Sequence, residues 1–474
     1  MTSQADMNAT ANMTFRRHVG RLGYFALAFG GIVGSGWVVV LGEWLGAAGP
    51  GGAALAFGAG GITMALVCAC YAELTARMPR AGAEFVYVRT SLGAIPGFLV
   101  GWFLLLNFVG LAAFEGIALV WLFSALFPSM HDAPIYYVLG EPVGAIGLTA
   151  SFGGLLLLGW LNARGSGATV TFQKILTYGF IAFAVVLAVL GLSLGDFANT
   201  RPLFQMSPNG FPWSGVFWVF SMCLLFLNGF QGAAQVAEER AHGVSLSAVA
   251  WAMIAAVVAA SIFYVLIIFA VASAAPWEET VAAGLPTAHA FGVLSPSAPW
   301  LAQVVIVVAI VSLAKTWNVI VIIGARLIVA LARDHFFPSR LAALNSHGAP
   351  SLAVGLFSIL AALAVLLGPG AIVPILNLCA MCLAATFVLL LSVLLKERAS
   401  GTSKPEFKVP GNSVPILVAL ILVIAMGAVA AVLPLLKADG LPTEWLLLAG
   451  WGMAGAILFR ASRKVRNPDT ERSR

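Results

Sequence analysis

Long apolar runs alternate with short polar connections along almost the whole chain. An α-helix needs about 20 mainly apolar residues to cross the hydrocarbon core of a bilayer, so each run predicts one membrane-spanning helix. The pattern places twelve spans, at residues 22–45, 52–75, 94–127, 143–161, 168–194, 213–237, 245–274, 299–332, 351–367, 371–395, 413–435 and 443–461. We therefore expect an all-α polytopic membrane protein whose loops are too short to hold a soluble domain.

The positive charges are distributed unevenly over the connections. Of 25 Lys and Arg residues, all but Arg201, Lys315 and Lys437 lie near the chain termini or near the loops after spans two, four, six, eight and ten. The opposite connections carry acidic residues such as Glu278 and Glu279. Because positively charged loops stay on the cytoplasmic side, we expect a multi-pass protein of the cell membrane with both termini in the cytoplasm.

Composition narrows the class of protein further. Hydrophobic residues make up 61% of the chain and charged residues only 9%, whereas soluble domains carry about 25% charged residues. The mean hydropathy is +0.98. The net charge of +6 follows from the loop asymmetry and does not indicate nucleic-acid binding.

The residues that carry chemistry in enzymes are sparse at membrane depth. All five cysteines lie in apolar runs, and Cys379-x-x-Cys382 is typical of helix packing rather than of a metal site. The histidines lie in loops or at span ends, so we expect neither a metal centre nor catalytic residues. A channel is disfavoured because no repeated pore loop appears.

The first span is interrupted by Gly30-Gly31-Ile32-Val33-Gly34-Ser35-Gly36. Glycine and serine in the middle of an apolar run are poor helix formers, and unwound backbone in hydrocarbon is tolerated only where protein buries it or it lines a cavity. Amide groups freed at the start of a half-helix can hold a carboxylate. The alternative is a packing face, because Gly30 and Gly34 form a GxxxG motif.

A second interruption, Asn228-Gly229-Phe230-Gln231-Gly232, lies inside the sixth span. Interrupted spans at corresponding places in two halves of a chain indicate the binding site of a secondary transporter. The two interruptions together therefore favour a binding site over a packing face.

Two ionisable residues, Glu115 and Lys315, lie well inside apolar runs. Charges at membrane depth are costly and normally face a partner or a cavity. Asn107 shares a helix face with Glu115, so both are candidates for substrate binding or coupling. Glu115 and Lys315 either form a static ion pair or take part in transport, and the sequence leaves both interpretations open.

Five stretches resemble, in order along nearly the whole chain, motifs of the amino acid–polyamine–organocation (APC) superfamily of secondary transporters. Gly31–Gly36 is similar to its first-span GxIGSG motif, and Asn228–Gln231 followed by Glu238 and Glu239 is similar to its interrupted sixth span. The other matches are the loops at residues 71–88, 332–350 and 404–411.

The resemblance implies a leucine-transporter-type core, in which spans one to five and six to ten are inverted repeats and spans one and six are broken. Residues 1–21 and 462–474 are then cytoplasmic tails, 22–396 form the ten-helix core, and 397–461 add spans eleven and twelve with the preceding loop.

The resemblance also implies that substrate lies between the two breaks. Its carboxylate would rest on the amides of Gly34, Ser35 and Gly36, and its amino group on backbone carbonyls of both breaks. The expected substrate-binding residues are Ile32, Val33, Gly34, Ser35, Gly36, Leu225, Phe226, Asn228, Gly229 and Gln231.

Three positions depart from the family pattern. Leu225 stands where relatives often carry an aromatic gate, with Phe226 beside it. Gln231 stands where some relatives carry glutamate, and this exchange suits a neutral substrate side chain. Phe180 stands where some relatives carry a lysine in span five.

We expect Lys315 to replace that lysine as a built-in cation, because Thr316 and Asn318 make its surroundings polar. Burial lowers the pKa of a lysine and a nearby carboxylate raises it, so a conformational cycle could load and release a proton. Lys315, Thr316 and Asn318 are thus the expected coupling residues, with proton coupling favoured over sodium and no cofactor.

The sequence thus predicts a secondary active transporter of small, neutral amino acids that works by alternating access with proton coupling or exchange. The alternative is transport of an organic amine or polyamine, with Glu115 as counter-charge. The expected partners are a small-molecule substrate and the lipid bilayer, not nucleic acid. No oligomeric state follows from the sequence.

Overall fold

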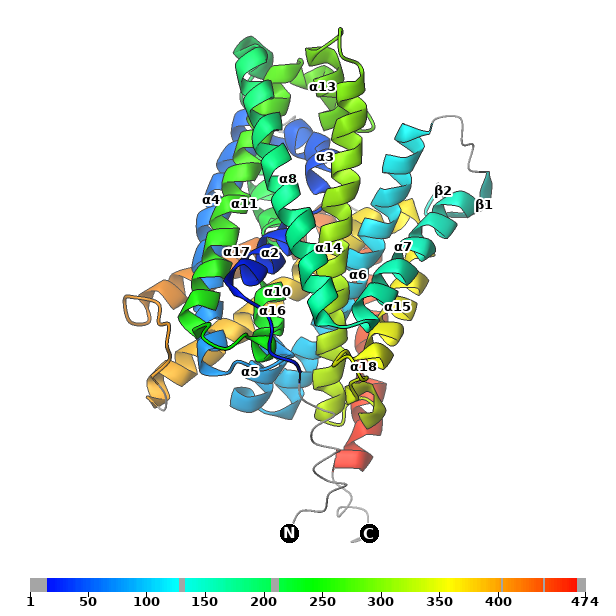
Figure 1. Ribbon diagram of the computed structural model, residues 1–474. Helices are drawn as coiled ribbons and strands as arrows, with labels where there is room; N and C mark the ends of the chain where they lie inside the picture. Colours follow the sequence, from blue (N-terminus) through cyan, green and yellow to red (C-terminus); the bar gives the residue numbers. More distant parts are fainter. Residues whose placement is uncertain (1–14, 128–132, 206–212, 402–403, 438–439, 467–474) are drawn as a thin grey trace, which may run out of the picture.

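The computed structural model describes residues 15–127, 133–205, 213–401, 404–437 and 440–466 (Figure 1). The first half of the chain forms α2 (Arg21–Ile32), α3 (Gly36–Val39), α4 (Leu41–Arg77), α5 (Ala83–Leu92), α6 (Ala94–Leu126), β1 (Pro134–Val138), β2 (Glu141–Gly144), α7 (Ala145–Ala163), α8 (Ser166–Leu194) and η1 (Phe197–Thr200). The second half forms α9 (Ser214–Phe226), α10 (Gln231–Gln235), η2 (Ala237–Glu239), α11 (Leu246–Ala274), α12 (Trp277–Val281), α13 (Pro286–Leu294), α14 (Trp300–Arg333), η3 (Ser339–Ala342), α15 (Ser351–Val365), η4 (Pro369–Ala371), α16 (Ile372–Ser400), α17 (Val414–Lys437) and α18 (Thr443–Arg466). Most of the two expected tails, residues 1–14 and 467–474, lies outside the described residues.

The long helices confirm the expected fold class. In the described part of the chain, 11 helical segments are long and apolar enough to cross a membrane. The ninth expected span corresponds to α15, which has only 15 residues. The chain is therefore a polytopic α-helical membrane protein, to which β1 and β2 add one antiparallel hairpin.

Both expected helix interruptions are present. α2 ends at Ile32 and α3 begins at Gly36, while α9 ends at Phe226 and α10 begins at Gln231. Between α9 and α10, Gly229 has a φ of 123°, a backbone conformation that glycine adopts without strain. The first span and the second meet within α4, where Gly49 is not helical and Pro50 follows it.

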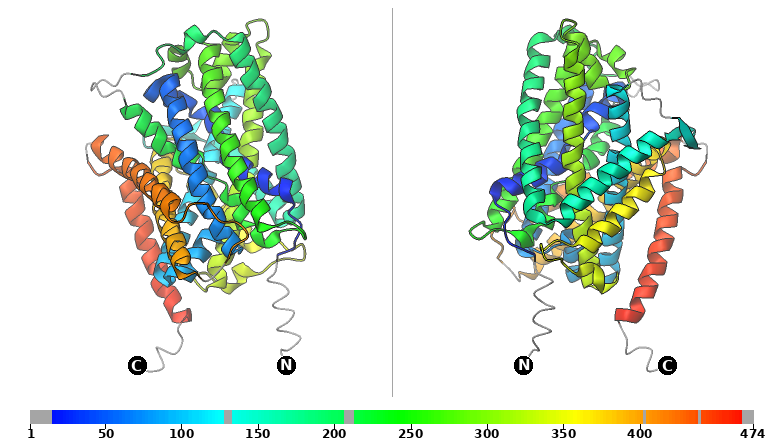
Figure 2. Two further views of the ribbon diagram at one scale, coloured as in Figure 1. Left: turned by 90° about the vertical axis from the view of Figure 1, so that its left-hand side faces the viewer. Right: turned by 45° about the vertical axis from the view of Figure 1, so that its right-hand side comes forward.

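The interrupted helices lie at the centre of the helical body. α2 packs against α8, α11 and α14, and α10 packs against α2 and α14. α17 and α18 lie on the outside and contact α16 (Figure 2). Helices from both halves of the chain therefore surround the two breaks.

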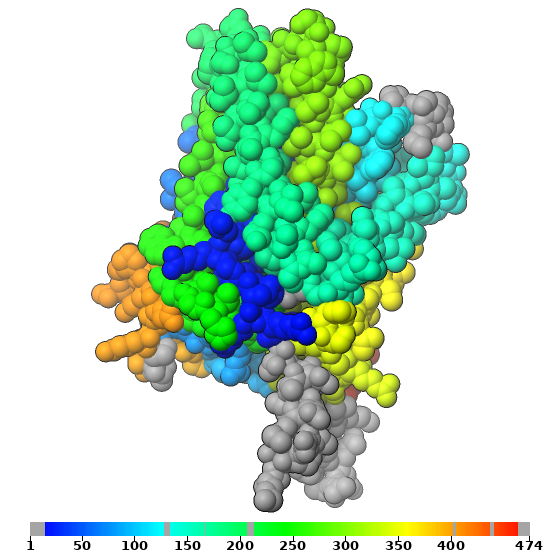
Figure 3. Space-filling model, viewed as in Figure 1, coloured from blue at the N-terminus to red at the C-terminus, as the bar shows by residue number. Residues whose placement is uncertain are grey.

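The described chain begins and ends at the same end of the molecule, called here the terminal end (Figure 1). There the segment before α2 crosses the surface (Figure 3). The His18 N–H donates to the Glu239 carbonyl at 2.8 Å, and the Arg16 guanidinium donates to the Ser346 carbonyl at 2.8 Å. This segment therefore ties the loops after α10 and α14 together.

Glu84 of α5 is fully buried at the terminal end, outside the spans. The side-chain amide of Gln235 in α10 donates to Oε2 of Glu84 at 2.8 Å, and the amide oxygen of Gln235 accepts from the Gly82 N–H at 2.8 Å. Burial disfavours the ionised carboxylate and raises the pKa of Glu84 to about 7. A titratable group thus bonds to α10, the short helix that follows the second break.

Candidate functional site

The two helix breaks touch each other through their backbones. A Cβ atom placed on Gly31 would lie 2.7 Å from the Gly229 carbonyl oxygen, and one placed on Gly229 would overlap the Gly31 carbonyl group. Glycine is needed at both positions because the two chains approach closely there. The unwound segments of the two halves therefore form one continuous wall.

A small cavity of about 40 Å³ lies beside this wall. Most of the expected substrate-binding residues line it: Ile32, Gly34, Gly36, Leu225, Phe226, Asn228, Gly229 and Gln231. Glu115 and Thr316 also line it, together with apolar residues that include Phe108, Leu111, Phe114 and Leu376. Glu115 is the one charged residue among the described residues of this lining.

The carboxylate of Glu115 lies in the first break. The Ser35 hydroxyl donates to Oε2 of Glu115 at 2.8 Å, and a Cβ atom on Gly34 would overlap Oε1. Glu115 is 3% exposed. An acidic side chain of the protein thus occupies the segment where the resemblance implies a substrate carboxylate.

The opposite side of the same break is held by α14. Lys315 donates from Nζ to the Val33 carbonyl, and the Thr316 hydroxyl lies 2.7 Å from the Gly30 carbonyl and 2.9 Å from the Val33 carbonyl. The Ser312 hydroxyl donates to the Gly34 carbonyl at 2.7 Å. These donors satisfy carbonyls that unwinding leaves without helical partners.

The fully buried ammonium of Lys315 also lies 4.5 Å from the centre of the Phe180 ring. This arrangement is a cation–π contact. It places the Lys315 ammonium beside Phe180, the position in α8 where the resemblance implies a lysine in some relatives. Among the described residues, no ion pair joins Lys315 to Glu115. Within the same break, Glu115 instead accepts from the Ser35 hydroxyl and Lys315 donates to the Val33 carbonyl.

The second break supplies neutral polar groups. Oδ1 of Asn228 is buried and has no hydrogen-bond partner among the described residues, so it can accept a hydrogen bond from a ligand in the cavity. The amide oxygen of Gln231 accepts from the Gly229 N–H at 2.8 Å. Gln231 thus both lines the cavity and stabilises the unwound backbone.

Phe226 separates the cavity from the end of the molecule opposite the termini. A Cβ atom on Gly36 would lie 2.6 Å from the Phe226 ring, and the Trp44 ring packs edge-on against Phe226 at 4.9 Å between centroids. Leu225 also lines the cavity. The bulky ring next to Leu225 therefore covers the cavity from this side.

Asn107 and Asn318 were expected at the site, but in the described part of the chain they neither line the cavity nor bond to either break. The side-chain amide of Asn107 donates to the Cys379 carbonyl at 3.3 Å, and that of Asn318 donates to Gln173 at 2.9 Å. Asn107 therefore joins α6 to α16, and Asn318 joins α14 to α8. Sequence reasoning missed Ser312, although its spacing of four residues from Thr316 puts both hydroxyls on one helix face.

Two broken helices that meet beside a cavity in a polytopic helical protein are typical of secondary transporters with discontinuous helices. Comparison with known proteins gives the particular family. The family model described as "Amino acid permease" matches residues 19–458. The chain belongs to this family, which is part of the APC superfamily.

Relatives from Bacillus subtilis (strain 168) carry names of transporters with different substrates. The methylthioribose transporter is 24% identical over 453 residues, 92% of either chain. The putative histidine permease is 25% identical over 347 residues, 69% of this chain and 67% of the relative. The branched-chain amino acid permease BcaP is 23% identical over 445 residues, 88% of this chain and 90% of the relative.

Proposed function

We propose that the protein is a proton-coupled secondary active transporter of small, neutral amino acids in the cell membrane, with both termini in the cytoplasm. The observation that carries the proposal is the ammonium of Lys315 bound to the Val33 carbonyl in the first break. A fixed cation at this place can do what a bound metal ion does, namely hold the broken helix against α14.

Coupling follows from the surroundings of Lys315. The ammonium is fully buried, and its hydrogen bond and ring contact both involve uncharged groups. The proton affinity of a buried group changes when its surroundings become hydrated. A conformational change that hydrates this side of α14 would therefore alter the proton affinity of Lys315 and link substrate movement to the proton gradient.

The cavity supports a small substrate with an uncharged side chain. Asn228 and Gln231 are neutral, and Leu225, Phe226 and Leu376 are apolar. A zwitterionic substrate can place its ammonium group at Glu115 and Asn228. Its carboxylate then has to share the first break with Glu115, which requires Glu115 to be protonated or displaced.

A second candidate avoids this conflict. An organic amine without a carboxylate would pair directly with Glu115, whose carboxylate has no ion-pair partner among the described residues. The position of Glu115 in the break specifically favours this candidate, because a like charge beside it is unfavourable.

Uptake into proteoliposomes tests the proposal. Purified protein is reconstituted, an inward pH gradient is imposed, and labelled neutral amino acids are compared with the amines that correspond to them without the carboxyl group. We expect accumulation of a neutral amino acid that depends on the pH gradient and not on sodium. Accumulation of the amines alone would select the second candidate, and transport of neither class would contradict both.

A further inference from the structure

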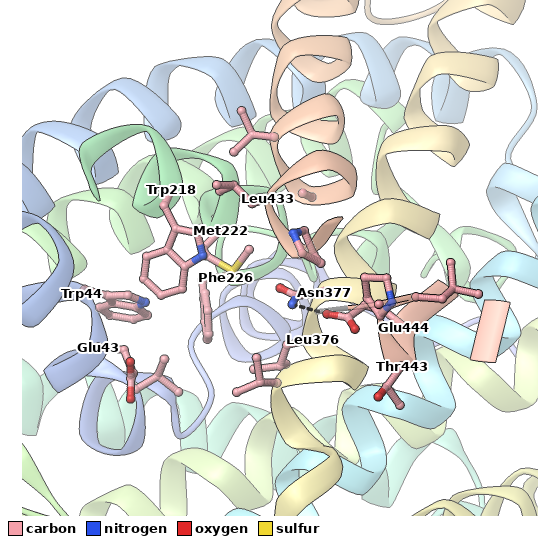
Figure 4. Close-up of a pocket in the computed structure, with 18 residues that line it drawn as sticks. Glu43, Trp44, Trp218, Met222, Phe226, Leu376, Asn377, Leu433, Thr443 and Glu444 are labelled. Carbon is pink, nitrogen blue, oxygen red and sulfur yellow. Dashed lines mark hydrogen bonds between the residues drawn. The ribbon is translucent and has the colours of Figure 1, made fainter. Parts of the chain in front are cut away.

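A larger cavity of about 550 Å³ lies on the other side of Phe226 from the central cavity (Figure 4). It is lined by the start of α4, by α9, by α16 and by the outer helices α17 and α18. Phe226 and Leu376 line both cavities. This outer cavity is therefore the space next to the central site on the side away from the terminal end.

The outer cavity contains a buried carboxylate that forms no ion pair among the described residues. Glu444, at the start of α18, is 6% exposed, and its Oε1 accepts a hydrogen bond from the side-chain amide of Asn377 at 2.8 Å (Figure 4). Burying a carboxylate is costly unless a positive charge compensates it.

The remaining lining fits the same kind of ligand. Glu43 supplies a second carboxylate, and the described lining residues include no Lys, Arg or His. Trp44, Trp218 and Phe226 provide aromatic rings, which attract organic cations. The indole N–H of Trp44 is fully buried without a hydrogen-bond partner among the described residues, so it can donate to an oxygen of a ligand.

We propose that this outer cavity is a second binding site, which takes a small organic cation through its ammonium group. The ammonium pairs with Glu444, and the apolar part of the ligand lies against Trp44 and Trp218. The proposal goes beyond the transport function and does not depend on which substrate the central cavity carries, because both tests below are made without transport.

The first test introduces a cysteine into the cavity and uses its labelling by charged reagents to measure the local electrostatic potential. Val373 lines the cavity and is 65% exposed, whereas the native cysteines are buried. We expect the labelling rate of a trimethylammonium methanethiosulfonate, divided by that of its sulfonate counterpart, to be about tenfold higher in Val373→Cys than at a reference position, since a cleft of one sign concentrates opposite charge. Val293→Cys, on α13 outside this cavity, provides the reference ratio.

The second test asks whether an amine occupies the site. Phenethylammonium should slow the labelling of Val373→Cys, and the uncharged 2-phenylethanol should not. Adding Glu444→Gln to Val373→Cys should reduce the preference for the positively charged reagent at least threefold. It should also abolish protection by the amine. Should that variant fail to fold, as judged by its melting curve, Glu43→Gln provides the same comparison.

The proposal would be overturned if the ratio of the two reagents' labelling rates were the same at positions 373 and 293. Protection by the amine that persists unchanged in the folded glutamine variant would also overturn it. If the labelling results are as expected while no substrate is transported, the outer site stands and the proposed transport function fails, so the two failures are distinguishable.

Discussion

Replacing Lys315 by methionine removes the ammonium and keeps a side chain of similar length. The broken helix retains other donors, because the Thr316 and Ser312 hydroxyls still lie 2.9 Å and 3.2 Å from the Val33 carbonyl. A hydrogen bond from a charged group contributes about 1.5–3 kcal/mol, but the desolvation cost of the buried ammonium disappears with it. We therefore expect the free energy of unfolding to change by less than about 2 kcal/mol.

The effect on coupling should be far larger. For one proton carried with each substrate molecule, a pH difference of one unit corresponds to about 1.4 kcal/mol and a tenfold accumulation. At a gradient of 1.5 units, the wild-type protein should then accumulate substrate about 30-fold. Lys315→Met should equilibrate substrate without accumulating it, and Lys315→Ala should do the same.

Three measurements on the same variant separate the possible outcomes. Substrate binding to the detergent-solubilised variant checks that the cavity persists, exchange of labelled substrate checks that the transport cycle persists, and accumulation under the pH gradient reports coupling. Ser312→Ala, which removes a neutral donor from the same break, is the matched control and should retain accumulation. A Lys315 variant that concentrates substrate and responds to external pH as the wild type does would refute the coupling role.

Further substitutions test the rest of the site. Gly34→Val and Gly36→Val should reach the membrane but lose substrate binding at least about tenfold, because a Cβ atom would overlap Glu115 in the first case and lie 2.6 Å from Phe226 in the second; normal transport by either variant would contradict the assignment. Gln231→Glu should admit cationic substrates while its oxygen still accepts from the Gly229 N–H, and Asn228→Ala should change the substrate profile, so an unchanged profile in both would show that the second break is not the site. The pKa of Glu84 is raised from 4.5 to about 7 in the folded protein, so its contribution to stability is complete below pH 4.5 and is lost as the pH rises through about 7. Melting curves across this range should show a loss of up to about 3 kcal/mol in the wild type and a flatter profile in Glu84→Gln, and parallel profiles would contradict the burial argument.

The sequence alone determined the class of protein and the places where its helices break. Membrane spans follow from run length, because a bilayer of given thickness needs a helix of given length. The breaks at Gly34 and Gly229 were predictable because glycine disfavours helix whatever its neighbours are. Glu115 and Lys315 were recognisable as special because any charge at membrane depth is costly.

Only the tertiary structure decided the partner of each polar group. Glu115 and Lys315 could have paired with each other, yet one binds Ser35 and the other the Val33 carbonyl. Asn107 shares a helix face with Glu115 but bonds to α16 instead of lining the cavity. Such choices depend on the axial positions and rotations of helices far apart in sequence, which local periodicity does not encode. The outer cavity depends on the same packing, because Asn377 and Glu444 come together only where α16 meets α18.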